Sequence, residues 1–581
     1  MTRSNDALFV AAIAATAAAI AIGGCLYLGL LAALLLIHGP GEVSHLPRPE
    51  REVQLLLLGL FRHPDQPWPP YPGSGPNSAP PVWLLWTCTT VVAAAATGLG
   101  VAARRAWHSW SLAGRVVADS HGDSRWAVSR DRGRLGRAAS PASMHPDGIV
   151  LGWFHNRLLQ TPREDNCLLL GVQRSGKTAT VVVPTLLGWR GSVVATSTKE
   201  ELVRLTGRFR QGLGPVHVFA PLDTDSAWIR DLGLGSATWN PVSEADSAAR
   251  AAEIADLFTS EHRTGSSSHW YLSAGNLIAG LLLKERGRGG DLRQVLRDLN
   301  ELNPAELAGL ELEGEDPTAR ELLRAFARTP DREAGSIAST ARSSLSLWLD
   351  ERVARATSSA VPSLDLDCLL EESGTLYLVA PAEEAERCRP LFSALLQSIL
   401  RRATARARRQ GGVSSPRLLL ALDEMANFAR IPRLAGYVSS GPGQGIQLLL
   451  AFHDLAQIEE GYGYEQARTI WNNCRARLLL PGQGDLRTLD HFSRAIGETT
   501  RLYESPSRSD DGRRSRSEQR TGRPLASPDA LRRLGRPVLL YADAPPARLA
   551  ARRWDQVPAW RNAIVNSLAV HPVSSPKEVS A

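Results

Sequence analysis

The stretch Gly171-Val172-Gln173-Arg174-Ser175-Gly176-Lys177-Thr178 decides the fold class of this chain. It fits the phosphate-loop pattern G-x-x-x-x-G-K-[ST], and it stands between an apolar run at 167–170 and a stretch at 179–187 that can begin a helix. In such loops the glycines let backbone amides approach a phosphate chain, the lysine reaches the β- and γ-phosphates, and the threonine hydroxyl ligates Mg²⁺. We therefore expect Gly171 to Ala179 to bind ATP with Mg²⁺. The alternative is a chance glycine turn before a helix.

A second motif supplies the acidic residues that a phosphate-loop ATPase needs. The apolar run at 418–422 ends in Asp423 and Glu424, about 250 residues after the loop. Asp423 is expected to hold the Mg²⁺ shell, and Glu424 is expected to act as the general base that polarises the attacking water. The alternative is that these residues only keep a strand end soluble.

Apolar, β-prone runs alternate with helical stretches through most of the chain. This pattern predicts an α/β fold with a mainly parallel sheet covered on both faces, over 145–242 and 366–560. Between these parts, 243–365 carries only helical signals and is expected to be an all-helical insertion. The runs lie at 167–170, 192–196, 216–220, 375–380, 418–422, 447–452, 477–480 and 538–541.

The N-terminal part contains two long runs without a charged residue, at 7–37 and 82–103. Each exceeds the roughly 20 apolar residues that span a bilayer, so they predict a transmembrane hairpin. Residues 38–81 would form a proline-rich extracytoplasmic loop, and 104–144, which begins with Arg104 and Arg105, a basic linker. By the positive-inside rule residues 1–6 and the bulk of the chain would be cytoplasmic, in a multi-pass protein of the bacterial inner membrane. A secretory signal is the alternative for the first run.

Composition adds few constraints. The net charge of +7 and the pI near 9.3 are compatible with an anionic partner, and the six cysteines form no C-x-x-C pair, so neither a disulfide framework nor a zinc site is indicated. Arginines cluster at 401–409 and 513–516. The first cluster is expected to be a solvated helix face with positive charge at its C-terminal end, and binding of phosphates is the alternative. Any contact to nucleic acid would be to its backbone, because no aromatic residues are interleaved. Residues 501–523 and 570–581 are polar and are expected to be disordered.

Several dispersed stretches resemble the type IV secretion system coupling proteins, the TraG/TraD-like family. The loop is followed by Val183-Pro184-Thr185-Leu186-Leu187. In the family's order, Trp239-Asn240-Pro241 then precedes the helical insertion and Gly335-Ser336-Ile337 lies near its end. The resemblance implies a membrane-anchored, RecA-like ATPase that forms a homo-oligomer, usually a hexamer. It also implies delivery of a relaxase–DNA complex or of protein effectors to the components of a type IV secretion channel, with the insertion helping to recognise the cargo.

The chain departs from the family pattern at three places. In 197–201 only Lys199 and Glu201 match an element that follows the second strand, and they are expected to be auxiliary to the site. Pro442 follows Gly441 where relatives carry an arginine finger, so Arg430 and Arg433 are the candidates for an arginine that acts across a subunit boundary. His453 replaces the glutamine that senses the γ-phosphate, and an imidazole cannot reproduce the donor and acceptor pair of an amide.

Two other functions remain open at this stage. A double-strand DNA translocase of the FtsK type is one, although such proteins usually have four membrane helices. The other is a docking receptor that binds nucleotide without hydrolysing it, which the changes at 197, 442 and 453 suggest. The joint presence of Lys177, Thr178, Asp423 and Glu424 argues against full loss of hydrolysis.

Overall fold

The computed structural model describes most of the chain, and it separates into two compact units, Met1–Asp119 and Ser120–Ala581. The expected segments 1–6, 38–81 and 570–581 lie outside the described residues, as does 104–121 of the expected linker. The residues described are 24–36 (except 26, 30 and 34), 83–97 (except 85), 122–223, 227–260, 268–301, 316–508 and 514–569.

In the first unit, the described residues of 24–36 and 83–97 are helical. The two stretches touch at Gly29, where an added Cβ would lie 2.3 Å from Thr89 Oγ1. Within the described residues we find no helix with the length and apolar character needed to cross a bilayer. This finding overturns the expectation of a multi-pass inner-membrane protein, and the predicted hairpin of 7–37 and 82–103 is not shown.

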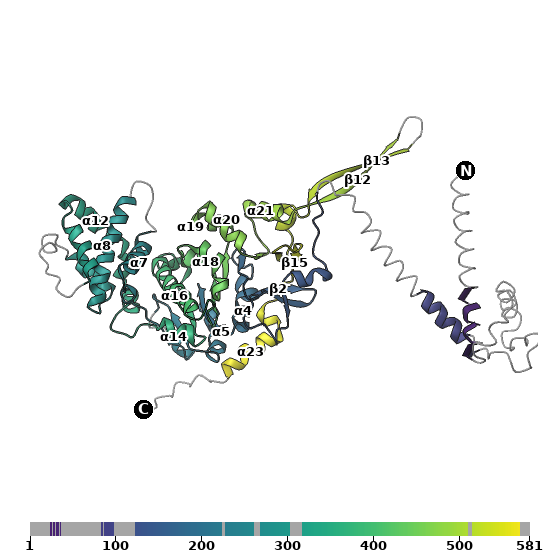
Figure 1. Cartoon of the computed structure of the whole chain (residues 1–581), viewed down its shortest axis with the longest axis horizontal. Helices are drawn as coiled ribbons and strands as arrows, with labels where there is room; N and C mark the ends of the chain where they lie inside the picture. Colours follow the sequence, from purple (N-terminus) through teal and green to yellow (C-terminus); the bar gives the residue numbers. More distant parts are fainter. Residues whose placement is uncertain are drawn as a thin grey trace, which may run out of the picture. The chain divides into compact units, whose positions relative to one another are not determined.

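The second unit is built on a large mixed sheet with the order β15-β14-β11-β4-β10-β9-β5-β8-β6-β7 (Figure 1). All neighbours from β11 to β7 are parallel, whereas β14 runs antiparallel to β11 and β15 antiparallel to β14. All eight predicted strands are present and the mainly parallel sheet is confirmed. The strands are β4 (Cys167–Leu170), β5 (Ser192–Ser197), β6 (Val216–Phe219), β7 (Gly235–Ser236), β8 (Thr375–Val379), β9 (Leu418–Leu422), β10 (Ile446–Phe452), β11 (Ala476–Leu479), β14 (Val538–Tyr541) and β15 (Ala547–Arg548).

The near-continuous hydrophobicity of these strands follows from burial on both faces of the sheet. Successive residues of a strand point to opposite faces, so Leu168 and Leu170 of β4 join one core while Cys167 and Leu169 join the other. Helices cover both faces: α4 and α5 pack in the core that contains Leu169, and α16 packs in the core that contains Leu168.

The helices of the nucleotide-binding part vary widely in length, and several short ones follow strands directly. The π-helical turn η3 (Thr178–Val182) and α4 (Val183–Gly188) follow β4. The others are α5 (Glu201–Gln211), α6 (Ala227–Asp231), α14 (Leu366–Glu371), α15 (Ala382–Ala385), α16 (Arg389–Arg409), α17 (Met425–Phe428), α18 (Leu434–Ser440), η7 (Pro442–Gln444), α19 (Leu455–Tyr462), α20 (Tyr464–Asn473), α21 (Leu486–Ile496), α22 (Pro528–Arg532), η8 (Trp554–Gln556) and α23 (Pro558–Ala569).

Between β7 and β8 the described residues, with gaps at 261–267 and 302–315, contain helices and no strand. The central helix is α8, which packs against α7, α11, α12 and α9 (Figure 1). Leu277, Ile278 and Leu282 of α8 are fully or almost fully buried there. The elements are η4 (Pro241–Glu244), α7 (Ala248–Ser260), α8 (Ser268–Gly287), α9 (Leu292–Asn300), α11 (Pro317–Ala327), α12 (Asp331–Ser344), η6 (Ser346–Leu349) and α13 (Glu351–Ala356).

Two features differ from the expected boundaries. The folded unit begins at about residue 122, before the expected limit at 145, with η2 (Ser129–Arg134) and a small antiparallel sheet of β1 (Arg137–Ala139), β3 (Arg157–Gln160) and β2 (Val150–Phe154). The segment 501–523, expected to be disordered, belongs largely to the antiparallel hairpin of β12 (Glu498–Arg508) and β13 (Arg514–Pro524). Backbone pairing between the two strands orders this segment, although it has few apolar residues that could form a core.

Candidate nucleotide-binding site

The phosphate loop leaves the sheet at the end of β4, between β10 and β11. Gly171 N donates to Phe452 O of β10 at 3.0 Å, and a Cβ on Gly171 would lie 2.7 Å from Ser175 Oγ and 3.0 Å from Leu480 Cβ. Gly176 has φ +92° and Arg174 has φ 62°, so the loop turns through the left-handed region twice. The crowding at the first glycine and the positive φ at the second explain why the motif needs glycine at both positions.

The helix after the loop begins with a π turn. Pro184 has no N–H, so it cannot donate to the carbonyl four residues earlier. The structure places η3 directly before it, and Val183 N donates to Thr178 O, a bond across five residues. This local widening keeps Thr178 at the first turn of the helix, next to the loop.

Lys177 turns back over the loop that carries it. Its Nζ donates to Gly171 O at 2.7 Å and to Val172 O at 3.4 Å, and the residue is only 5% exposed. Burial lowers the pKa of Lys177, whereas the nearby charges of Asp423 and Glu424 act in the opposite direction. The ammonium group is therefore held inside the loop, where a phosphate chain would be cradled.

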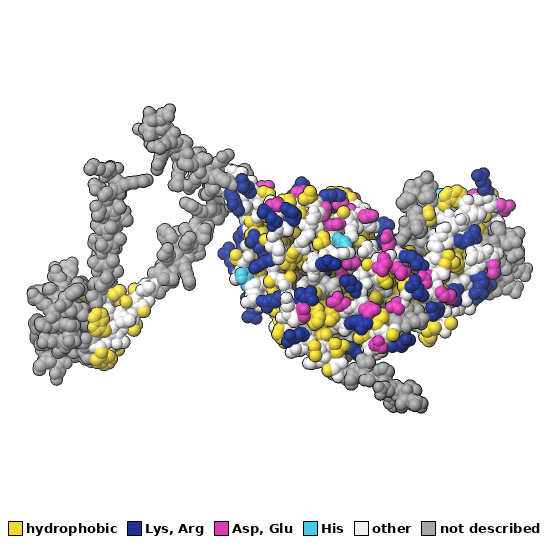
Figure 2. All heavy atoms as spheres, turned by 180° about the vertical axis from the view of Figure 1, so that it is seen from behind, with side chains coloured by type: hydrophobic (Ala, Val, Ile, Leu, Met, Phe, Trp, Pro, Cys, Tyr) yellow, Lys and Arg dark blue, Asp and Glu magenta, His cyan; other side chains and the backbone are white. Residues whose placement is uncertain are grey.

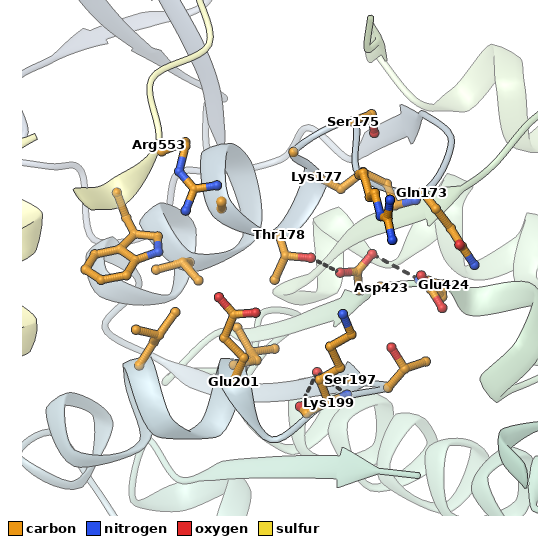
Figure 3. Close-up of a pocket in the computed structure, with 18 of the residues that line it drawn as sticks. Gln173, Ser175, Lys177, Thr178, Ser197, Lys199, Glu201, Asp423, Glu424 and Arg553 are labelled. Atoms are coloured by element: carbon orange, nitrogen blue, oxygen red, sulfur yellow. Dashed lines mark hydrogen bonds between the residues drawn. The ribbon is translucent and has the colours of Figure 1, made fainter. Parts of the chain in front are cut away.

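Thr178 and Asp423 meet at the end of β9. Thr178 Oγ1 donates to Asp423 Oδ2 at 2.5 Å (Figure 3). Thr196 Oγ1 of β5 donates to the Asp423 carbonyl at 2.7 Å. Burial raises the pKa of Asp423, while the Thr178 hydroxyl and Lys177 oppose that shift. A hydroxyl and a carboxylate side by side are the hard oxygen donors that Mg²⁺ takes, so the residues present fit this ion.

Glu424 follows Asp423 in a left-handed conformation, with φ 52°. Such a conformation is uncommon for a residue with a side chain, and it is a form of strain that gathers at functional sites. The Glu424 side chain is 17% exposed and its Oε1 lies 4.0 Å from His453 Nε2, longer than a hydrogen bond. His453 first, and Lys177 and Lys199 after it, lower the pKa of Glu424 against the effect of burial. The carboxylate is thus kept ionised.

His453 lies at the end of β10, the strand between β4 and β9. Its backbone is fixed on both sides: His453 N donates to Gln457 Oε1 at 2.8 Å, and Gln483 Nε2 donates to His453 O at 2.7 Å. Its Nε2 is buried and has no hydrogen-bond partner among the described residues. His453 does not line the nucleotide pocket itself. The structure therefore brings it to Glu424, and its expected role as a γ-phosphate sensor stays a prediction.

These side chains surround a pocket of about 510 Å³ (Figure 3). Of the expected residues, Val172 to Ala179, Asp423 and Glu424 line it, as do Lys199 and Glu201; Gly171 lies at its edge without lining it. Lys199 is held near the end of β5, where Ser197 Oγ donates to its carbonyl at 2.7 Å. Arg553 and Trp554 also line the pocket, although no sequence motif predicted them there. An Arg-Trp pair outside any motif offers no local signal for a binding site.

The arginines selected from the sequence lie elsewhere. Arg430 and Arg433 are exposed, and neither lines the pocket of its own chain.

Near the end of α16, Arg401 pairs with Glu253 and Arg402 with Glu244 at 3.0 Å. Their charge is thus used within the fold, as the alternative of a structural helix end implies. Figure 2 shows Lys and Arg side chains interspersed with Asp and Glu over the visible face.

Comparison with known proteins places the chain in one family. The family model described as type IV secretory system conjugative DNA transfer matches residues 143–556. The chain therefore belongs to this family, and the resemblance noted in its sequence is confirmed. The conjugal transfer protein TraG of Escherichia coli is 29% identical over 470 residues, covering 72% of this chain and 71% of TraG. VirD4 of Rhizobium rhizogenes is 26% identical over 460 residues, covering 75% of this chain and 66% of VirD4.

Solved structures show the same fold. The unbound conjugative coupling protein TrwBdeltaN70 superimposes with a TM-score of 0.54 at 18% identity, covering 77% of this chain and 99% of that one. TrwB in complex with ADP and Mg²⁺ gives a TM-score of 0.54 at 17% identity, covering 74% of this chain and 93% of TrwB. The large mixed sheet with its phosphate loop thus belongs to the α/β fold of these coupling-protein structures.

Proposed function

We propose that this chain is an ATPase that couples ATP hydrolysis to the transfer of DNA through a type IV secretion system. The observation that carries the proposal is the meeting of the phosphate loop with Asp423 and Glu424 in one pocket. Family membership adds conjugative DNA transfer as the process served. The solved complex of TrwB with ADP and Mg²⁺ supports the same cofactors here.

Each residue has a distinct part in the reaction. Lys177 exchanges its bonds to the loop carbonyls for the β- and γ-phosphates, and the loop amides hold the phosphate oxygens. Thr178 and Asp423 would hold Mg²⁺, which offsets negative charge on the phosphates. Glu424 orients a water molecule and accepts its proton as the water attacks the γ-phosphorus, and His453 keeps that carboxylate ionised and in place. ADP and inorganic phosphate leave.

The assembly and the cargo follow from the family and are part of the proposal. Arg430 and Arg433 are exposed and outside the pocket of their own chain, which is compatible with one of them reaching the nucleotide of a neighbouring subunit in a homo-oligomer such as a hexamer. The helical insertion would contact the cargo, a relaxase–DNA complex or protein effectors. Contacts to nucleic acid would be to the phosphate backbone, and the channel components would receive the cargo.

The test compares Lys177→Ala and Glu424→Gln in the full chain. Lys177→Ala should lose ATP binding, because it removes the cation of the loop. Glu424→Gln should keep ATP binding but lower turnover roughly 100-fold or more, since it removes the general base. Both should abolish DNA transfer between donor and recipient cells, and Glu200→Gln, an exposed carboxylate paired with Arg204, should leave all three measurements unchanged. ATP binding without hydrolysis in the parent chain, together with normal transfer by Glu424→Gln, would instead identify a docking receptor.

A further inference from the structure

The segment that carries Arg553 and Trp554 is fixed to the rest of the fold on both sides. Before it, Ala550 and Trp153 of β2 exchange backbone hydrogen bonds of 2.8 and 3.0 Å. After it, Trp560 and Ile564 of α23 are each 2% exposed, and α23 packs against α5 and α4. The C-terminal segment is therefore anchored to β2 on one side of Trp554 and to α5 and α4 on the other, and these contacts hold Trp554 at the pocket.

The pocket has two chemically different parts. In Figure 3, Gln173 and Glu424 lie on one side and Arg553 on the opposite side, with Thr178 and Asp423 between them. Outside the phosphate loop, the lining includes the partly exposed side chain of Leu205 of α5 in addition to the Trp554 ring, whereas Val183 of α4 and Leu202 of α5 are buried. A charged phosphate chain does not pack against an apolar surface, whereas a flat aromatic base does.

Trp554 has the properties of a stacking platform. It is half-buried at the edge of the core, yet its indole N–H is buried without an acceptor among the residues that the structure describes. Buried indole N–H groups usually have a partner, so the ring is not fully satisfied by the fold alone. Beside it, Arg553 uses Nε to bond Asp555 at 3.1 Å, and its side chain is 53% exposed toward the pocket and the solvent.

We propose that Trp554 is the nucleobase-binding residue of this site: its ring stacks on the base of the bound nucleotide, with Leu205 completing an apolar base subsite. This inference rests on the proposed function, because it needs the triphosphate at the phosphate loop. Stacking on an aromatic ring accepts every base, since every base has a π-face. The subsite therefore contributes affinity for nucleoside phosphates over inorganic phosphates and does not select adenine.

The experiment measures binding of ATP, ADP and inorganic tripolyphosphate to the full chain by titration calorimetry. Trp554→Leu keeps an apolar side chain but removes the aromatic face, so it should weaken ATP and ADP roughly tenfold and leave tripolyphosphate unchanged. Trp554→Phe keeps a π-face and should stay close to the parent for all three ligands. Arg561→Ala, an exposed residue of α23 outside the pocket, is the matched control and should change nothing.

Three results would overturn the base subsite: unchanged ATP binding in Trp554→Leu, an equal loss of ATP and tripolyphosphate, or identical affinities in the Leu and Phe variants. Lys177→Ala separates this failure from failure of the proposed function, because it should lose all three ligands. If Lys177→Ala binds ATP as the parent does, the nucleotide site itself is wrong. If Lys177→Ala loses ATP while Trp554→Leu retains it, only the role of Trp554 is wrong.

Discussion

His453 Nε2 lies 4.0 Å from Glu424 Oε1. His453 follows the end of β10, and Glu424 follows the end of the neighbouring strand β9. The backbone of His453 is held by hydrogen bonds to Gln457 and Gln483. Because His453 is the first cause of the lowered pKa of Glu424, the proposed mechanism gives the histidine a positioning role toward the base. Direct sensing of the γ-phosphate by His453 stays a prediction.

The first prediction concerns the pH dependence of ATP turnover. A carboxylate whose pKa is lowered stays ionised to lower pH, and its activity as a base is lost as the pH falls through that pKa. His453→Gln removes the main cause of the lowering, so the acid limb of the pH–rate profile should move to higher pH. His217→Gln, on β6, serves as the control. An acid limb that stays in place in His453→Gln would show that the ring does not act on Glu424.

The second prediction tests the pair formed by Thr178 and Asp423. Thr178→Ala removes a hydroxyl ligand of Mg²⁺, and Asp423→Asn removes the carboxylate beside it. The apparent affinity for Mg²⁺ in ATP binding should therefore fall roughly 10–100-fold in each variant, whereas Thr178→Ser should keep the parental affinity. The measurement is nucleotide affinity across a Mg²⁺ titration. Thr180→Ala is a suitable control, because the Thr180 hydroxyl donates to Gly176 O and the residue does not line the pocket. Equal Mg²⁺ curves for Thr178→Ala and Thr180→Ala would contradict the assignment.

The third prediction concerns subunit boundaries. If Arg430 or Arg433 acts on a neighbouring nucleotide, the corresponding alanine variant should lose turnover but keep ATP binding. Mixing that variant with Lys177→Ala should restore part of the activity, because some interfaces then combine an intact loop with an intact arginine. The measurement is ATPase rate against mixing ratio. Full activity of both single alanine variants would rule out both arginines.

The fourth prediction concerns stability. Arg210 of α5 is fully buried and donates to the carbonyls of Trp189 and Gly191 and to Thr375 Oγ1, and burial lowers its pKa to about 10. Arg210→Met leaves these acceptors without a donor, so the free energy of unfolding should fall by about 3 kcal/mol. Denaturant unfolding measures the change. Arg208→Met, on the same helix but less buried, should lower the free energy of unfolding far less. Equal decreases in the two variants would mean that the hydrogen bonds of Arg210 do not stabilise the fold.

Much of the site could be predicted because its strongest elements are local. The phosphate loop needs glycine at tight positions and a lysine and a threonine at fixed spacing, so Gly171 to Thr178 are readable in one stretch. The strand before Asp423 and Glu424 is likewise a continuous apolar run. The eight main strands could be placed because burial on both faces leaves them uniformly apolar.

Other features needed the tertiary structure. The hairpin of β12 and β13 has few apolar residues, so its order depends on pairing between strands and not on a hydrophobic pattern. The arginines of α16 resembled a phosphate-binding cluster until the structure paired Arg401 with Glu253 and Arg402 with Glu244, which lie about 150 positions away. The expectation of an inner-membrane location rested on two apolar runs, on the basic residues after the second and on the family resemblance, and no helix among the described residues meets the requirement for crossing a bilayer.

The sequence by itself determined that this chain has a phosphate loop, an acidic strand end and an α/β fold, because each depends on neighbouring residues and on burial along one strand. Only the tertiary structure decided that β10 lies between β4 and β9, which brings His453 to Glu424, and that the C-terminal segment brings Trp554 to the pocket. The order of strands in a sheet and the docking of a distant segment depend on contacts between residues hundreds of positions apart, and these leave no periodic pattern in the sequence.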